Sequence, residues 1–369
     1  MRRRTAAFAL VLTTLTTFLL MPDRADASAH ATKRADAAAA ALMEMYDSDT
    51  GLWPSTGWWN AANAVTALLD HSAQTGSRAY LDEVDVTFEK NEQDDFTNEY
   101  MDDTGWWGLA WVRAYDVTGD RKYLEMAQRD ADYMYSFRDD HCGGGIWWRS
   151  DKTYKNAITN ELFVKLSASL HNRIPGDTVY LERAAEVWDW FEASGMINDD
   201  HLVNDGLDDE TCANNGGVTW TYNQGVILGG LVEVSRATGD ASLLRRATQI
   251  ADAATSSASL NPGGVLTEPC EADDCGADGP SFKGIFVRNL GELERALPGT
   301  RFRGYLMTQA RTAYANDRDD HDRYGLHWAG PFDTADGARQ QSALDLMVAT
   351  AARPPTTSSA SRVAARGSS

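Results

Sequence analysis

A short turn that recurs along the chain constrains the fold more than any other feature of the sequence. It places a glycine after an apolar segment of helical period and before an amphipathic, charged segment. Glycine adopts the left-handed backbone that ends a helix, and the Asp, Ser or Thr after it can cap the next helix. Each copy therefore predicts a helical hairpin. The copies are TGSRAYL at Gly76, TGDRKYL at Gly119, PGDTVYL at Gly176, TGDASLL at Gly239 and PGTRFRGYL at Gly299.

The segments before these turns are rich in aromatic residues, glycine and amides, which predicts helices that are covered on all sides. The segments after the turns resemble surface helices. An opening helix over about 31–46 and a closing helix over about 338–351 complete six inner and outer pairs. We therefore expect an all-α fold, an (α/α)6 toroid or barrel of six helical hairpins. The other inner helices are predicted over 59–73, 104–117, 156–171, 221–238 and 281–297.

An open α-solenoid, which is a scaffold for protein binding, is the alternative architecture. Its repeats would be nearly constant in length. Here the distance from one turn glycine to the next ranges from 43 to 63 residues, and the excess lies in loops that enter the inner helices. Toroid enzymes build their clefts on such loops, so the irregularity favours an enzyme.

The two ends of the chain differ from the part between them. Three arginines, an apolar run and then small residues predict a secretory signal peptide over 1–29, and the run is too short for stable membrane insertion. Residues 354–369 are mostly Pro, Thr, Ser, Ala, Arg and Gly, which predicts a disordered tail. We expect a secreted, monomeric protein with one catalytic domain over 30–353.

The charge of the chain restricts its partners. The formal net charge is −20, and removal of the predicted signal peptide makes it more negative. Such a field repels polyanions, which argues against nucleic acid and against uronate-rich or sulfated polymers. A neutral polysaccharide is unaffected by it.

The four cysteines form an even set in a chain predicted to be exported, which favours disulfides. Cys270 and Cys275 are close enough for a local bridge, which would leave Cys142 to pair with Cys212. Neither a C-x-x-C pair nor an H-E-x-x-H pair is present in the sequence, so we expect no metal and no cofactor.

Adjacent aspartates are frequent in this sequence, so such a pair has little specificity alone. Most of the seven pairs are expected to be solvated or to cap helices. Asp102 and Asp103 differ, because they stand directly before a predicted inner helix that starts at Thr104, among Tyr100, Trp106 and Trp107. Flat rings beside carboxylates suit a sugar. Hydrolysis of a glycosidic bond requires two carboxyl groups, and neighbouring residues favour the narrow separation of a retaining enzyme.

Several blocks of the sequence together resemble glycoside hydrolase family 76, in order and spacing along nearly the whole predicted mature chain. They are MDDTGWWGLAWVRAYDVTGDRKYLEMA, CGGGIWW, YKNAITNELF, WTYNQGVILGGL, FKGIFVRNL and WAGPFDTADGARQQSALDL. The resemblance implies an (α/α)6 toroid that acts as a retaining endo-α-1,6-mannanase on neutral α-mannan or manno-oligosaccharide. It implies that Asp102 is the nucleophile and Asp103 the general acid/base.

The same blocks and the rings beside them supply the candidate substrate-binding residues. For Lys283, as for Arg288, a structural ion pair is an equal alternative to a place on the cleft floor. The candidates are Trp59, Asn60, Tyr100, Trp106, Trp148, Asn156, Asn160, Asp205, Tyr222, Asn223, Gln224 and Lys283.

Three other functions fit parts of the pattern. A cell-wall mannan transglycosylase would use the same site, and a carbohydrate-binding protein without turnover would need the rings but no acid dyad. A toroid epimerase would rely on histidines, and the sequence has seven, none of them within the predicted starts of the inner helices. A variant at Asp103 distinguishes the binding protein from the enzymes.

Overall fold

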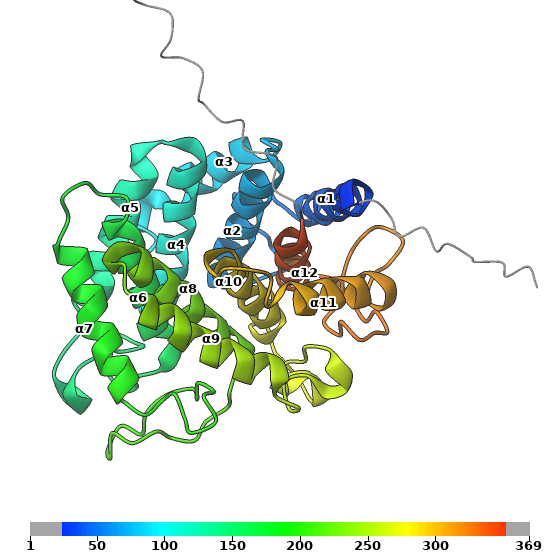
Figure 1. Ribbon diagram of the computed structural model, residues 1–369. Coiled ribbons are helices and arrows are strands. Elements are labelled where there is room, and N and C mark those ends of the chain that lie inside the picture. Colours follow the sequence, from blue (N-terminus) through cyan, green and yellow to red (C-terminus); the bar gives the residue numbers. More distant parts are fainter. Residues whose placement is uncertain (1–23, 352–369) are drawn as a thin grey trace, which may run out of the picture.

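The computed structural model describes residues 24–351, and nearly all of their regular structure is helical (Figure 1). Six helices form an inner ring: α2 (Trp58–Thr75), α4 (Met101–Thr118), α6 (Ala157–His171), α8 (Thr221–Thr238), α10 (Phe282–Ala296) and α12 (Gly337–Thr350). Six lie outside it: α1 (Arg24–Met43), α3 (Leu81–Asn91), α5 (Arg121–Tyr135), α7 (Val179–Ala193), α9 (Ala241–Ser256) and α11 (Arg303–Asn316).

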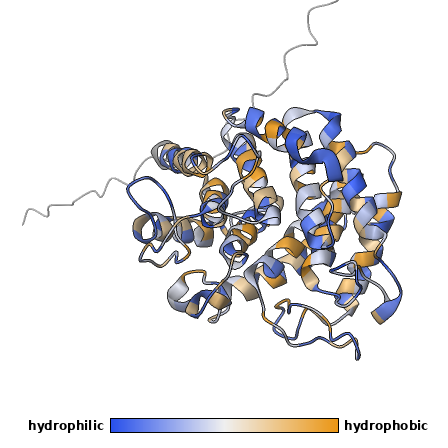
Figure 2. Cartoon of the chain, turned by 180° about the vertical axis from the view of Figure 1, so that it is seen from behind, coloured by the Kyte–Doolittle hydropathy of each residue, from blue (hydrophilic) through white to orange (hydrophobic). Residues whose placement is uncertain are grey.

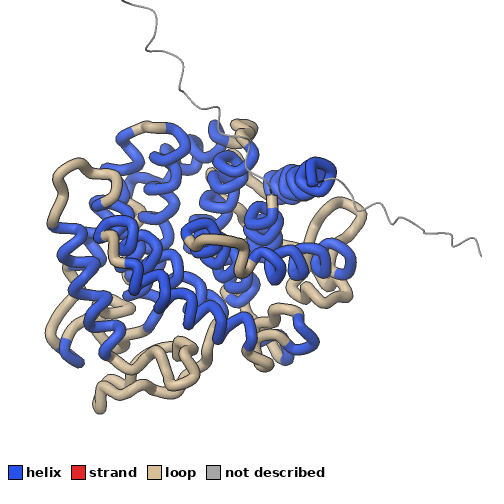
Figure 3. Tube along the Cα trace, viewed as in Figure 1, coloured by secondary structure: helices blue, strands red, loops and turns tan. Residues whose placement is uncertain are grey.

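The inner helices close into a ring. Each packs against the next in the order α2, α4, α6, α8, α10 and α12, and α12 packs against α2. Within residues 24–351 the extended segments form only isolated bridges and no strand, so long loops join the helices (Figure 3). The predicted (α/α)6 toroid is confirmed.

Three of the five recurring glycines end inner helices as the sequence predicts, whereas α6 ends at His171 and α10 at Ala296, before Gly176 and Gly299. Gly76, Gly119 and Gly239 lie just after α2, α4 and α8 with φ between 77° and 79°, and their amides donate to carbonyls of the last helical turn. Asp120 and Asp240 then cap α5 and α9 through their side chains. Local contacts thus fix both ends of the corners at Gly119 and Gly239, whereas α3 begins without a side-chain cap.

Burial differs between the two rings. Every residue of α6 from 157 to 170 is buried, whereas α5 and α9 each keep a polar outer face (Figure 2). No helix among residues 24–351 is both long enough and apolar enough to cross a membrane. The predicted signal peptide falls largely outside the described residues, apart from the residues that open α1, and the predicted tail over 354–369 falls wholly outside them.

Close contact between α10 and α12 depends on a glycine. A Cβ atom at Gly284 would lie 2.3 Å from the Cα of Ser342, which belongs to the α12 backbone. We expect Gly284→Ala to lower the free energy of unfolding by roughly 2–3 kcal/mol, because two helices must separate. Gly304 on α11 has open space at the same position. Gly304→Ala should change stability by less than about 1 kcal/mol in urea unfolding, and equal losses for the two variants would contradict this packing.

Five inner helices, α2, α4, α6, α8 and α10, line a cavity of about 350 Å³ mainly with residues of their carboxyl-terminal halves, together with Trp106. Its lining pairs arginine and lysine with acids, as in Arg113 with Asp70 at 2.6 Å and Lys165 with Glu292 at 2.9 Å. Cations are favourable near helix carboxyl ends, so helix dipoles and ion pairs account for this lining. The candidate active site lies at the opposite face, where the inner helices begin.

Candidate active site

Asp102 and Asp103 lie in the first turn of α4, after Tyr100. The helix therefore starts three residues before the predicted Thr104. The reason is a contact that the sequence does not show, because the amide of Met101 donates to the carbonyl of Trp148 at 2.8 Å. An antiparallel bridge between Tyr100 and Arg149 continues this pairing and brings the CGGGIWW loop beside the two aspartates.

Trp148 holds the carboxylate of Asp102. Its indole Nε1 donates to Asp102 Oδ2 at 3.1 Å, and its ring lies 5.1 Å from that of Tyr100. Asp102 Oδ1 is buried without a hydrogen-bond partner among the described residues. Burial, and next the charge of Asp103, hold the pKa of Asp102 well above its usual range. One oxygen of Asp102 is thus oriented and the other is left free.

Asn98 holds the carboxylate of Asp103. Its Nδ2 donates to Asp103 Oδ2 at 2.7 Å, and its own Oδ1 accepts from the amide of Tyr100 at 2.7 Å. Burial raises the pKa of Asp103 to about 6, while the hydrogen bond from Asn98 lowers it and the charge of Asp278 raises it. Because both pKa values are raised, we infer that the pair shares one proton near neutral pH.

The raised pKa of Asp103 predicts a pH-dependent change in stability. An unfolded aspartate titrates near 3.9 and folded Asp103 at about 6, so the native state binds more protons between these values. Stability must then fall as pH rises through this window. We expect Asp103→Asn to raise the melting temperature at pH 7.5 and to leave it nearly unchanged at pH 4. A lower melting temperature at pH 7.5 would contradict this assignment.

Four rings, here called the aromatic floor, cross the mouth of the barrel beside the dyad. They are Trp59 of α2, Trp106 of α4, Tyr222 of α8 and Phe282 of α10. Trp59 lies 5.6 Å from Trp106 and 6.1 Å from Phe282, and Tyr222 lies 3.9 Å from Phe282 and 6.4 Å from Trp106. Trp106 and Phe282 are buried, whereas Trp59 and Tyr222 are partly exposed. The last two therefore offer the ring surface of this floor.

A second polar group lies on the Trp148 side of the site. Tyr154 packs edge-on against Trp148 at 6.2 Å, and its hydroxyl donates to Asp205 Oδ2 at 2.6 Å. Burial raises the pKa of Asp205, although hydrogen bonds from Tyr154 and Trp220 oppose the shift. Asp205 is half-buried. It is placed to accept hydrogen bonds from sugar hydroxyls.

Several predicted binding residues instead tether loops to the inner helices. Asn160 bonds both backbone groups of Ile146, and Gln224 bonds both backbone groups of Val203. These side chains are buried and their polar atoms are occupied by the protein. Asn156 caps α6 by accepting from Thr159, and Asn60 donates to Ser281. Asn223 is buried and its amide has no hydrogen-bond partner among residues 24–351.

Lys283 and Arg288 are buried in ion pairs. Lys283 pairs with Glu271 and donates to the carbonyl of Leu326 at 2.6 Å, and its side chain is 1% exposed. Arg288 pairs with Asp345 at 3.4 Å. Of the two alternatives for these cations, the structure has the ion pair, and neither belongs to the site that we describe.

The structure therefore brings together eight of the candidates. Five of the other six form contacts within the protein, and Asn223 is buried beside Tyr222 on α8 with an amide that has no hydrogen-bond partner among residues 24–351. The structure also adds residues that the sequence analysis missed, and each of these lies just before or at the start of an inner helix. Their position near the start of a predicted inner helix is the sequence signal that could have identified them. The residues brought together are Asp102, Asp103, Tyr100, Trp148, Trp59, Trp106, Tyr222 and Asp205; the added residues are Asn98, Tyr154, Asp278 and Phe282.

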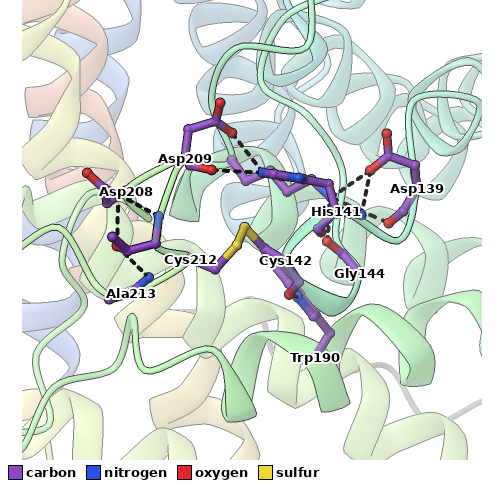
Figure 4. The surroundings of a disulfide bond; sticks show 11 residues. Asp139, His141, Cys142, Gly144, Trp190, Asp208, Asp209, Cys212 and Ala213 are labelled. Atoms are coloured by element: carbon purple, nitrogen blue, oxygen red, sulfur yellow. Dashed lines mark hydrogen bonds and ion pairs between the residues drawn. A yellow bond between two sulfur atoms is a disulfide. The ribbon is translucent and has the colours of Figure 1, made fainter.

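Both expected disulfides are present, Cys142–Cys212 and Cys270–Cys275. The first ties the CGGGIWW loop to the loop of Asp208 and Asp209, and His141 Nε2 lies 3.0 Å from the carboxylate of Asp209 (Figure 4). His141, Cys142 and Cys212 are close enough in space to suggest a metal site. Cysteine binds zinc as a thiolate, and these two sulfur atoms are bonded to each other instead. The cluster therefore joins two loops and does not offer thiolate ligands.

Comparison with known proteins assigns the family. The profile of Glycosyl hydrolase family 76 matches residues 30–360. The chain is 32% identical over 334 residues to mannan endo-1,6-alpha-mannosidase DFG5 of Saccharomyces cerevisiae, covering 79% of this chain and 70% of that protein. The solved structure of the alpha-1,6-mannanase of Salegentibacter sp. HEL1_6 superposes with a TM-score of 0.79 at 27% identity, covering 87% of this chain and 98% of that one.

A second structure of the Salegentibacter enzyme is an inactive variant in which two consecutive aspartates are replaced by alanine, in complex with alpha-1,6-mannotetrose. It superposes with a TM-score of 0.80 at 26% identity. The match of profile, sequence and fold extends over the toroid that carries the dyad and its aromatic floor. This chain belongs to glycosyl hydrolase family 76 and is a glycoside hydrolase.

Proposed function

We propose that this protein is secreted and that it cleaves internal α-1,6-mannosidic bonds of neutral mannan with retention of anomeric configuration. The observation that carries the proposal is the dyad, two consecutive carboxyl groups in the first turn of α4 with a different donor on each. Trp148 holds Asp102 and Asn98 holds Asp103. The named activities of the relatives described above, and the consecutive aspartates replaced in the inactive variant, support the same assignment.

Retention is the outcome expected of two carboxyl groups on consecutive residues. Consecutive Cα atoms are about 3.8 Å apart, and retaining enzymes keep their carboxyl groups about 5–5.5 Å apart, whereas inverting enzymes need more room for water. The charge of Asp103 raises the pKa of Asp102, which agrees with a short separation. The first step uses one acid and one carboxylate, and the raised pKa values of both groups allow the pair to hold one proton. The placing of that proton on Asp103 rests on the family resemblance, because in the free protein burial and the charge of Asp103 raise the pKa of Asp102 further than that of Asp103.

In the proposed mechanism, Asp103 gives its proton to the glycosidic oxygen as the bond to the anomeric carbon breaks. The carboxylate of Asp102 attacks that carbon and forms a covalent mannosyl ester. The leaving sugar departs, and Asp103, now ionised, takes a proton from water while the water attacks the ester. Sugar and enzyme are released with Asp102 ionised and Asp103 protonated, so the cycle closes.

Secretion is supported by the predicted signal peptide over 1–29 and by two disulfides, which persist in oxidising compartments. A neutral substrate is supported by the formal net charge of −20. The site itself offers ring surface and carboxylates, which suit C–H faces and hydroxyls.

The test is digestion of unbranched α-1,6-mannan, with α-1,2- and α-1,3-linked manno-oligosaccharides as controls, followed by chromatography of the products. We expect a ladder of α-1,6-oligosaccharides at early times and no products from the other linkages. Release of mannose alone would contradict internal cleavage. Formation of longer chains without net hydrolysis would identify a transglycosylase.

A further inference from the structure

Asp278 places a third carboxylate beside the dyad. It is exposed at the mouth of the barrel, in the segment that leads into α10, and its Oδ1 accepts from the Nε1 of Trp59 at 2.8 Å. Its charge acts on Asp103. The proposed mechanism does not use this carboxylate.

Contacts of the residues that follow Asp278 fix its position. Gly279 lies against the Cys270–Cys275 disulfide, so that a Cβ atom there would be 2.8 Å from Cys275 Cβ and 2.9 Å from Cys270 Sγ. Asn60, the neighbour of Trp59 on α2, donates to Ser281 Oγ at 2.8 Å. Trp59 and Asp278 are thus fixed to each other by two contacts between α2 and the segment before α10, so the pair is preorganised for a ligand.

The two aspartates of the dyad have different surroundings. Asp102 accepts a hydrogen bond from Trp148. The ring of Trp148 packs against Tyr154, whose hydroxyl donates to Asp205. Asp103 has Asn98 and the charge of Asp278 near it. In a retaining hydrolase the nucleophile forms a covalent bond to the anomeric carbon of one sugar, while the acid protonates the glycosidic oxygen of the sugar that leaves. The leaving sugar must therefore lie on the Asp103 side.

We propose that Trp59 and Asp278 form the acceptor subsite, which holds the leaving mannose residue and, in transfer, an incoming manno-oligosaccharide. The carboxylate of Asp278 accepts hydrogen bonds from sugar hydroxyls, and the exposed part of the Trp59 ring contacts the apolar face of the same sugar. This inference rests on the function and the roles proposed above. It makes Asp278 a substrate-binding residue for the leaving side only.

The test compares two substrates that share the donor side. α-1,6-Mannotetraose places a sugar in the acceptor subsite, whereas α-1,6-mannobiosyl fluoride leaves this subsite empty and needs little acid assistance. We expect Asp278→Ala to lower kcat/KM on mannotetraose about 10- to 100-fold, the range for lost hydrogen bonds to a charged group. Its kcat/KM on the fluoride should change by no more than about twofold. Asp273→Ala removes an exposed acid from the same disulfide loop and should change neither.

Full pH profiles separate binding from an electrostatic effect on Asp103. The acceptor-subsite proposal requires the loss on mannotetraose to persist at the maximum of the Asp278→Ala profile. A shifted alkaline limb with an undiminished maximum would overturn it, as would equal losses on both substrates or no loss on either. Wild-type protein that is inactive on both substrates would instead refute the proposed function.

Discussion

Asp102→Asn and Asp103→Asn should each lower turnover of α-1,6-mannan by about 10³-fold or more while the fold persists. In the proposed mechanism the first variant lacks the carboxylate that forms the ester, and the second lacks the proton donor and acceptor. Neither should unfold the protein, because asparagine has nearly the shape of aspartate and relieves the repulsion between two half-buried acids. Initial rates and circular dichroism measured on the same preparations check both statements.

A matched control is available in the exposed pair Asp199 and Asp200, which lies away from the inner helix starts. Asparagine at both positions should leave activity within about twofold of wild type, in line with a solvated surface position. Azide gives a further check on the roles. It can replace the water that Asp103 activates, so Asp103→Ala with an activated α-mannoside and azide should yield α-mannosyl azide. Activity near wild type in either single variant of the dyad would refute the assignment.

Loss of the Cys142–Cys212 disulfide should produce the largest change in stability. The bridge joins residues 70 positions apart, whereas Cys270 and Cys275 are 5 apart. The loop-entropy relation gives about 4 kcal/mol for the long loop and about 2 kcal/mol for the short one. We expect the double alanine variants to lose stability in this order in equilibrium urea unfolding. Equal losses, or a larger loss for the short bridge, would contradict the entropic account.

Neighbouring contacts explain why the long bridge also bears on the site. The buried ammonium of Lys155 donates to Asp139 Oδ1 at 2.9 Å and to the carbonyls of His141 and Gly144 at 2.7 and 2.6 Å. These bonds shape the loop that ends in Trp148. The alanine variant without the long bridge should therefore also lose mannan turnover, because Trp148 is free to shift from Asp102. The variant without the short bridge should lose transfer to added acceptors before it loses hydrolysis.

The fold was predictable because its determinants are local. A turn such as TGDRKYL contains its own glycine, cap and corner residue, and Gly119 and Asp120 adopt those roles in the structure. The closing helix was expected over 338–351 and spans Gly337–Thr350. The start of α4 was missed by three residues because Met101 is paired with Trp148, and no local signal records a partner so far along the chain.

The site was predictable only in part, because several of its contacts join residues that are far apart in the sequence. The dyad stood out by its position before an inner helix. Aspartates of two other pairs form contacts within the protein, since Asp139 accepts a hydrogen bond from Lys155 and Asp208 accepts one from the amide of Thr211. Asp278 and Trp59 are 219 residues apart, so their pairing appears only in three dimensions. Asn160 and Gln224 were predicted to bind substrate, whereas in the structure loop backbones occupy the hydrogen bonds of their amides, and the sequence does not show such distant partners.

The most direct test of the double-displacement account is the configuration of the first product. Wild-type protein is mixed with α-1,6-mannotetraose, and the anomeric protons are followed by NMR from the first minute, before mutarotation mixes the anomers. The account predicts that the α-anomer of the new reducing end appears first and that the β-anomer follows slowly. Initial release of the β-anomer would show single displacement by water and would contradict the role of Asp102 as nucleophile.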